Sequence, residues 1–144
     1  MEKRSNKNEV EQISFEYIKL LLEVKYGCKV RQVKEGQEGS VMQVWSPKGY
    51  TKNTLQVNTE STVSETVAVL IKRIINGRPV AIVVDFHVIK FIGVEGAYSL
   101  EEEKLQQLLL DGECVDTVTS EDGGSMYALF PKKLLLDHCS FIAA

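Results

Sequence analysis

Apolar residues recur every three or four positions near the start of the chain, which is the spacing that places side chains on one face of an α-helix. Asn8 is a suitable N-cap for this segment, and Gly27 stands where helices commonly end. Residues 28–33 alternate between polar and apolar, which predicts a half-buried strand directly after the helix. The helix itself is predicted over residues 9–26, with an apolar face of Val10, Ile13, Tyr17, Leu20, Leu21 and Val24.

Two further strands are predicted beyond a polar loop at residues 34–39. Residues 41–45 are mostly apolar, and residues 54–59 again alternate between polar and apolar. The segment that separates them, residues 47–53, contains Pro, Gly and Asn, which favour turns. We therefore expect the two strands to form a hairpin.

A second helix is predicted over residues 62–76. Thr62 and Glu65 have the spacing of a capping box, apolar residues follow at helical spacing, and an Asn-Gly pair provides a stop. The next segment, residues 79–86, is almost continuously apolar and rich in β-branched residues, which is typical of a central strand covered on both faces. Residues 87–94 are expected to pair with it as an antiparallel strand.

The last third of the chain adds one more helix and a second strand pair. A capping box at Ser99 predicts a helix over residues 99–111. Two strands joined by a glycine-rich turn, and then a short turn or helix, are predicted at residues 114–119, 126–130 and 131–138. The predicted order is α-β-β-β-α-β-β-α-β-β. It indicates a single α+β domain over residues 1–144, with a mixed β-sheet flanked by helices.

Length and composition are those of an ordinary globular protein. The chain has 144 residues, of which 44% are apolar and 26% are charged, enough for one sizeable core. The longest apolar run, Val80 to Val84, is far shorter than the roughly 20 residues of a membrane helix, and the polar first residues do not resemble a signal peptide. The three cysteines stand singly, so we expect free thiols in a reduced, cytoplasmic setting without membrane association.

Charge is distributed unevenly along the chain. Residues 1–94 contain 14 Lys and Arg against 10 Asp and Glu, whereas residues 95–144 contain 3 against 10. Basic side chains release counterions when they contact a nucleic-acid backbone, so the first part of the chain permits contact with phosphate. The excess is too small to require such contact, because a dedicated nucleic-acid surface carries a concentrated basic patch.

Residues 9–92 are predicted to contain, in order, a helix, a strand, a hairpin, a helix and two strands. This order resembles that of the PD-(D/E)XK nucleases, notably the archaeal Holliday-junction resolvases and their small relatives. The resemblance implies an acidic residue on the opening helix, an Asp on the first hairpin strand, and a Glu-x-Lys or Gln-x-Lys triplet on the second. Those groups would hold Mg²⁺ and activate the attacking water.

Two of these three groups are absent from this chain. A glutamate of the helix, such as Glu11, would supply the first acid, but residues 41–44 contain no Asp. The triplet reads Gln56-Val57-Asn58, which keeps a Gln and lacks the Lys. The resemblance therefore implies a nuclease-like scaffold without its metal chemistry. The alternative is that Gln56 and Asn58 are ordinary polar positions on a half-exposed strand.

A second candidate site lies at the end of the predicted central strand. Asp85 and His87 are two residues apart, so on a continuing strand they would share one face and could bind a metal ion or act as an acid–base pair. The alternative is a strand-end Asp beside a hydrogen-bonded His.

The first hairpin is the strongest candidate for a functional surface. It carries aromatic and basic residues close together, and the preceding strand and loop add two more cations: Arg31, Lys34, Trp45, Lys48, Tyr50 and Lys52. Aromatic rings stack on bases while Lys and Arg contact phosphate, which is a common way to hold single-stranded nucleic acid. The same side chains would also anchor a protein interface, and Trp45 would alternatively fill the core.

We therefore expect a non-catalytic, nuclease-like binding module without a cofactor, acting on nucleic acid or on a protein that handles it. Its size is typical of the accessory proteins of phages and mobile elements. Two alternatives stay open. One is a divergent metal-dependent DNA nuclease, which would use Mg²⁺ held by Glu11 with Gln56 or Asp85. The other is a homo-oligomeric interaction or inhibitor protein.

Overall fold

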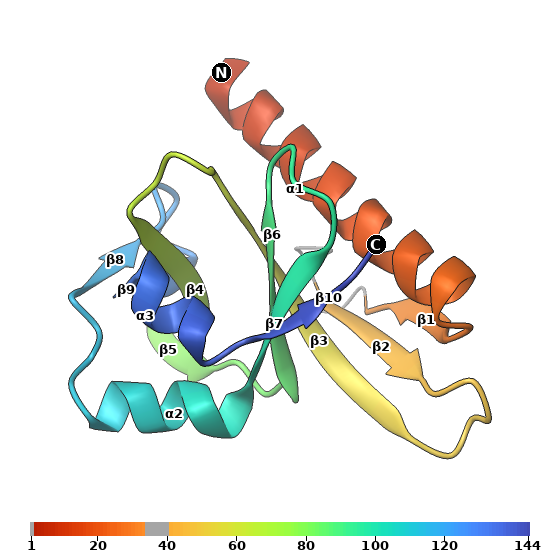
Figure 1. Ribbon diagram of the computed structural model, residues 1–144. Coiled ribbons are helices and arrows are strands. Elements are labelled where there is room, and N and C mark those ends of the chain that lie inside the picture. Colours follow the sequence, from red (N-terminus) through yellow and green to blue (C-terminus); the bar gives the residue numbers. More distant parts are fainter. Residues whose placement is uncertain (1, 34–40) are drawn as a thin grey trace.

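Two β-sheets form the centre of the protein, and helices pack on them (Figure 1). The computed structural model describes residues 2–33 and 41–144, with side chains described from Glu9 onward. The larger sheet has the strand order β1-β2-β3-β6-β7-β10, in which β3 and β6 run parallel and the other neighbours are antiparallel. Its strands are β1 (Lys29–Gln32), β2 (Val41–Trp45), β3 (Lys52–Glu60), β6 (Phe86–Phe91), β7 (Ala97–Glu101) and β10 (Ser140–Ile142).

The smaller sheet is antiparallel, with the order β5-β4-β9-β8. Its strands are β4 (Thr66–Ile75), β5 (Arg78–Ala81), β8 (Asp116–Thr119) and β9 (Ser125–Pro131). The edge strand β5 pairs only with residues 72–75 of β4. The first half of β4 therefore has an edge without a neighbouring strand in this sheet, and that edge meets β3 of the larger sheet.

Helices cover the sheets on two sides. α1 (Glu2–Leu20) continues into the π-helical segment η1 (Leu21–Lys25) and packs on one face of the larger sheet. α2 (Glu102–Leu110) and α3 (Lys132–Asp137) pack with the smaller sheet against the opposite face. Within the described residues, no helix is long and apolar enough to cross a membrane.

Two apolar cores result from this layering. The first lies between α1 and the larger sheet and includes Phe15, Ile18 and Met42. The second lies between the two sheets and includes Ile89 from β6 and Phe130 from β9. Because odd and even residues of a strand face opposite sides, β6 contributes Val88 to the first core and Ile89 to the second.

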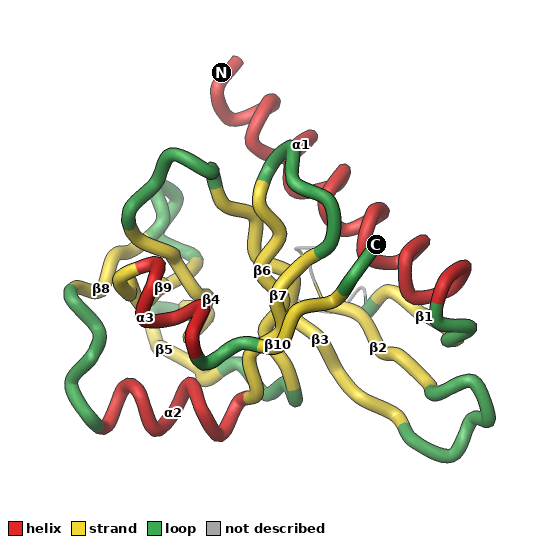
Figure 2. Tube along the Cα trace, viewed as in Figure 1, coloured by secondary structure: helices red, strands yellow, loops and turns green. Residues whose placement is uncertain are grey.

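The predicted α+β class and the mixed sheet flanked by helices are confirmed (Figure 2). The first helix is present, although it begins at Glu2 rather than after Asn8. The first hairpin and the strand pair near the C-terminus are also confirmed, as β2–β3 and β8–β9. α2 begins at Glu102 because Ser99 belongs to β7. The loop predicted at residues 34–39 lies outside the described residues.

The helix predicted over residues 62–76 is wrong, because residues 66–75 form strand β4. Val67 and Val69 are two residues apart and both fully buried in the second core, which is the alternation of a strand. Helical and alternating spacing overlap in a short apolar segment, and β-branched residues favour the strand. Pairing with β9 along its length then stabilises β4 in the extended form.

The buried central strand predicted over residues 79–86 is also wrong. Asn76 and Gly77 have φ angles of 53° and 75°, and this two-residue turn folds the chain back so that β5 pairs with β4. β5 is an exposed edge strand. Pro79 suits this position because it has no N–H to donate to a further strand. Val83, which follows β5, is 89% exposed. The central strand is β6 instead. It begins at Phe86 and pairs with β3 and β7, and not with β5.

Candidate functional site

The outer face of β1, β2 and β3 presents a row of basic and aromatic side chains. Alternate residues of these strands, such as Val30 and Val44, point to α1 and pack in or against the first core. The intervening residues therefore point to the opposite face of the sheet. In the strand register Lys29 lies beside Trp45, and Trp45 lies beside Lys52. The indole is thus flanked by a lysine on each neighbouring strand.

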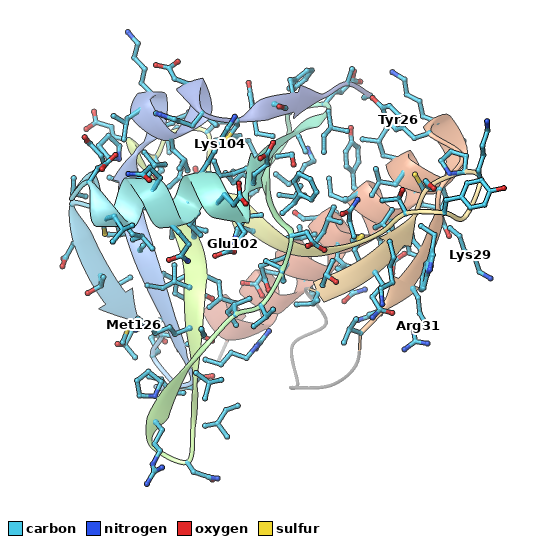
Figure 3. All side chains as sticks on the ribbon, turned by 90° about the horizontal axis from the view of Figure 1, so that it is seen from below. Tyr26, Lys29, Arg31, Glu102, Lys104 and Met126 are labelled. Atoms are coloured by element: carbon cyan, nitrogen blue, oxygen red, sulfur yellow. The ribbon has the colours of Figure 1, made fainter. Side chains whose placement is uncertain are left out.

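A second row lies one step further along the same face and consists of Arg31, Gln43 and Thr54. Lys29 and Arg31 are exposed, and Figure 3 shows both extending from the side of β1 into solvent. Neighbouring strands of a sheet are about 4.8 Å apart, so the Cα atoms of two residues that flank a central strand are roughly 10 Å apart. Cations therefore stand on both sides of one aromatic ring.

The turn after β2 extends this surface. Its shape is fixed by hydrogen bonds from the Ser46 N–H to the Thr51 carbonyl and from the Gly49 N–H to the Ser46 carbonyl, both 2.8 Å long. Lys48 and Tyr50 are exposed on this turn. A groove of about 740 Å³ runs between the turn and β1, and Arg31, Trp45 and Lys48 are among its lining residues.

This surface is locally positive, although the net charge of the whole chain is −3. Across residues 27–33 and 41–59 there are four Lys and Arg and no Asp or Glu. We call this surface the basic sheet face, and it comprises Lys29, Arg31, Trp45, Lys48, Tyr50 and Lys52.

Further along β3, the same side of the strand turns from surface to interior. Gln56 and Asn58 are only 2% and 6% exposed, because the smaller sheet covers them. Asn58 Oδ1 accepts the Leu70 N–H at 3.1 Å, and Glu60 Oε2 accepts the Ala68 N–H at 3.1 Å. Both donors lie on the first half of β4, beyond the reach of β5. The polar residues of β3 therefore satisfy the edge of β4 and join the two sheets.

One sequence interpretation expected Gln56 and Asn58 to be ordinary polar positions on a half-exposed strand. That expectation is wrong, because both side chains are buried. A polar side chain that is buried must find hydrogen-bond partners, and Asn58 finds one on each neighbouring segment: it also donates from Nδ2 to the Val88 carbonyl at 3.4 Å.

A polar cleft of about 390 Å³ lies where β3 meets the smaller sheet. Glu11 and Gln56 both line it, as do Glu60 and Glu121, whereas Asp85 does not. Glu60 is already engaged, because its second oxygen accepts the Ser61 N–H at 3.1 Å. Across residues 2–33 and 41–144, no three His, Cys, Asp or Glu side chains gather in a way that would hold a metal ion.

Asp85 and His87 do not form the acid–base pair that their spacing suggested. Asp85 lies just before β6, and its Oδ2 accepts the Thr54 N–H at 2.7 Å. His87 is buried and bonds through Nε2 to Oε2 of Glu102 at 2.5 Å. Burial would raise the pKa of Glu102, but hydrogen bonds with His87 and Gln106 outweigh it and lower that pKa. The hydrogen bond between His87 and Glu102 joins β6 to the start of α2.

Lys90 is a buried basic residue of the mixed sheet. Its ammonium donates to the carbonyls of Phe91 and Val94 and lies 4.4 Å from the centre of the Tyr17 ring. Burial lowers the pKa of Lys90, and the nearby Glu95 partly opposes this. Tyr17 in turn accepts the Gly96 N–H at 2.7 Å. Lys90 therefore binds the turn between β6 and β7 to α1.

The structure brings most of the sequence-predicted contact residues onto one surface. Arg31, Trp45, Lys48 and Lys52 belong to the basic sheet face, with Tyr50 exposed at its turn, while Lys34 lies outside the described residues. Sequence reasoning missed Lys29, which alternation from Arg31 along a strand would have found. It also missed Glu102, whose contact with His87 depends on how β6 and β7 pair.

No family model, curated protein or solved structure matches this chain.

Proposed function

We propose that this protein is a non-catalytic binding module and that its basic sheet face binds single-stranded nucleic acid. The observation that carries the proposal is the register that sets Trp45 between Lys29 and Lys52. An aromatic ring offers a stacking surface for any base, and cations beside it contact the phosphates before and after that base.

A single strand suits this surface better than a duplex. The bases of a duplex are stacked on one another and present only their edges in the grooves, so an indole on an open sheet cannot stack on them. A single strand exposes the base faces, and the groove beside Trp45 gives its backbone a path along Arg31 and Lys48. Residues 27–33 and 41–59 contain no Asp or Glu, and Asp85, whose carboxylate lies beside Thr54, accepts the Thr54 N–H there.

The test is the anisotropy of short fluorescent oligonucleotides titrated with the protein, as single-stranded DNA, single-stranded RNA and duplex. Single strands are expected to bind more tightly, with affinity falling as salt rises. Trp45→Ala should weaken binding roughly 5- to 150-fold, since one stacked base contributes about 1 to 3 kcal/mol. Replacing Lys29 and Lys52 together by Ala should reduce the slope of log affinity against log salt by about 1.4, at about 0.7 for each phosphate contact.

The matched control is Lys104→Ala, which removes an exposed lysine from α2, away from the basic sheet face (Figure 3). It should leave both affinity and salt slope unchanged. Binding that ignores salt, or that responds equally to Lys104 and to the Lys29 and Lys52 pair, would refute the proposal. No binding to any oligonucleotide would favour a protein partner on the same surface.

The nuclease alternative has a separate test. Magnesium-dependent cleavage of branched or linear DNA, abolished by Glu11→Gln or Asp85→Asn, would establish it. Glu11 and Gln56 line the same polar cleft, whereas Asp85 does not line it and its carboxylate is engaged with the backbone of β3.

A further inference from the structure

A row of four polar side chains crosses the larger sheet next to the row that contains Trp45. Its first three members lie side by side on β1, β2 and β3. β3 pairs in parallel with β6, and continuing that register by one residue places Asp85 next to Thr54. Neighbouring residues in a register lie on the same face of the sheet. The row, which we call the polar row, therefore consists of Arg31, Gln43, Thr54 and Asp85.

Asp85 is held in a fixed position although it is exposed. Its N–H donates to the Thr54 carbonyl at 2.8 Å, and its carbonyl accepts the Glu102 N–H at 3.0 Å. Its Oδ2 also accepts the Thr54 N–H at 2.7 Å. A carboxylate has acceptor positions for about four hydrogen bonds. Asp85 therefore presents further acceptor positions to a ligand, and its backbone does not have to be ordered when the ligand binds.

Arg31 lies at the other end of the polar row. Three strand spacings separate its Cα atom from that of Asp85, which is about 14 Å. Figure 3 shows the Arg31 side chain extending into solvent, where its length allows the guanidinium to turn over the row. Gln43 and Thr54, between the two charges, are half-buried and neutral. The polar row thus offers a fork of donors at one end and a carboxylate acceptor at the other.

We propose that the polar row binds a guanine base, so that the single strand on the basic sheet face is recognised through a guanine next to the base stacked on Trp45. The inference rests on the proposed function, because the basic sheet face must first hold a single strand. Trp45 and Gln43 are two residues apart on β2, which separates their Cα atoms by roughly 7 Å. This separation is close to that of successive nucleotides in an extended strand.

Guanine is the base whose edges match both ends of the polar row. Its neighbouring acceptors O6 and N7 bind an arginine fork, and its neighbouring donors N1–H and N2–H₂ suit a carboxylate. Adenine would turn the acceptor N1 toward the Asp85 carboxylate, and a pyrimidine has no N7 for Arg31. In single-stranded nucleic acid both edges of a base are accessible, so one guanine can make the two contacts together.

Fluorescent thymine oligonucleotides with one central guanine, adenine or cytosine test the proposal by anisotropy. The guanine strand is expected to bind roughly 5- to 150-fold more tightly than the strand of thymine alone, which is the range for one bidentate base contact. Two base analogues separate the contacts. Hypoxanthine lacks the N2 amino group that Asp85 accepts, and 7-deazaguanine lacks the N7 that Arg31 binds, so each should lose most of the gain.

Variants assign these contacts to residues. Asp85→Asn keeps an oxygen for the Thr54 N–H and places an NH₂ group where the second carboxylate oxygen was. It should bind the guanine and hypoxanthine strands equally, while still binding 7-deazaguanine more weakly than guanine. Arg31→Ala should show the reverse pattern. Lys104→Ala on α2 is the control and should keep both preferences.

The outcomes separate this inference from the proposed function. Equal affinity for all four bases, with binding that still depends on Trp45 and on salt, would overturn the guanine site and leave the proposed function intact. A guanine preference that survives both Asp85→Asn and Arg31→Ala would overturn the assignment to the polar row. A protein that binds none of the strands would overturn both.

Discussion

Asn58 should be a residue on which the attachment of the two sheets depends. The change that isolates its polar role is Asn58→Leu, because leucine nearly preserves the side-chain size while removing the hydrogen-bonding groups. The Leu70 N–H then loses its acceptor at 3.1 Å, and the Val88 carbonyl loses a donor. Both groups are backbone atoms of buried residues, so water cannot readily replace the lost bonds.

The magnitude follows from that burial. Leaving one buried N–H without a partner costs about 1 to 3 kcal/mol, whereas the longer bond to Val88 adds little. We expect the free energy of unfolding to fall by about 2 kcal/mol. At about 3 to 4 °C for each kcal/mol in a chain of this size, the melting temperature should fall by roughly 6 to 8 °C.

Urea unfolding followed by circular dichroism measures this change, and the slope against urea concentration should stay the same, since the folded state remains as compact. Asn53→Leu is the control, because it makes the same substitution on the same strand at a half-exposed position. A loss below about 0.5 kcal/mol for Asn58→Leu, the range of ordinary surface changes, would refute the role of Asn58 as the link between the sheets.

Three further outcomes follow from single contacts. Gly96→Ala should destabilise the fold far more than Gly93→Ala, as measured by calorimetry. Both glycines have a φ near 80°, so the backbone strain of the two substitutions is similar. A Cβ at residue 96 would meet the Phe141 ring at 2.6 Å, whereas a Cβ at residue 93 would meet nothing within 4 Å. Because the pKa of Glu102 is held below its ordinary value of 4.5, its ionised form stabilises the fold above about that pH. The contribution is lost as pH falls through the lowered pKa, so Glu102→Gln should flatten the acid limb of a stability profile. Burial raises the pKa of Cys139 to about 11, so mass spectrometry should find this thiol slow to alkylate at pH 8 and fast once urea unfolds the chain.

The first 60 residues show where sequence patterns suffice. The first helix and the β2–β3 hairpin are determined by local signals: amphipathic spacing, a terminal glycine, and a turn with Pro, Gly and Asn. The predicted hairpin grouped Trp45 with Lys52 on one surface, although Lys52 was expected in the turn and in fact lies on β3. Lys29 joins them only through the register of β1 with β2, which is a contact between distant residues.

Residues 62–86 show where local patterns fail. The segment that forms β4 has apolar residues at both helical and alternating positions, and its pairing with β9, some 60 positions away, selects the strand. The wrong helix also affected the prediction for the next segment. Because a helix was expected before it, the apolar segment that begins at Pro79 was interpreted as the central strand. The Asn76-Gly77 pair was read as a helix stop although it is also a strong hairpin signal, and the structure uses it as a hairpin.

One physical reason explains which neighbours of the candidate residues could be predicted from the sequence. A site made by one strand and its neighbours can be found from alternation, whereas the partners of buried polar residues depend on the packing of whole layers. On β3, Lys52 and Thr54 lie on an open face, while Asn58 and Glu60 on the same side of the same strand are covered by β4. The sequence shows one alternating polar row with no boundary in it. The boundary is set where the smaller sheet begins. It divides that row into an outer half on an open face and an inner half that joins the two sheets.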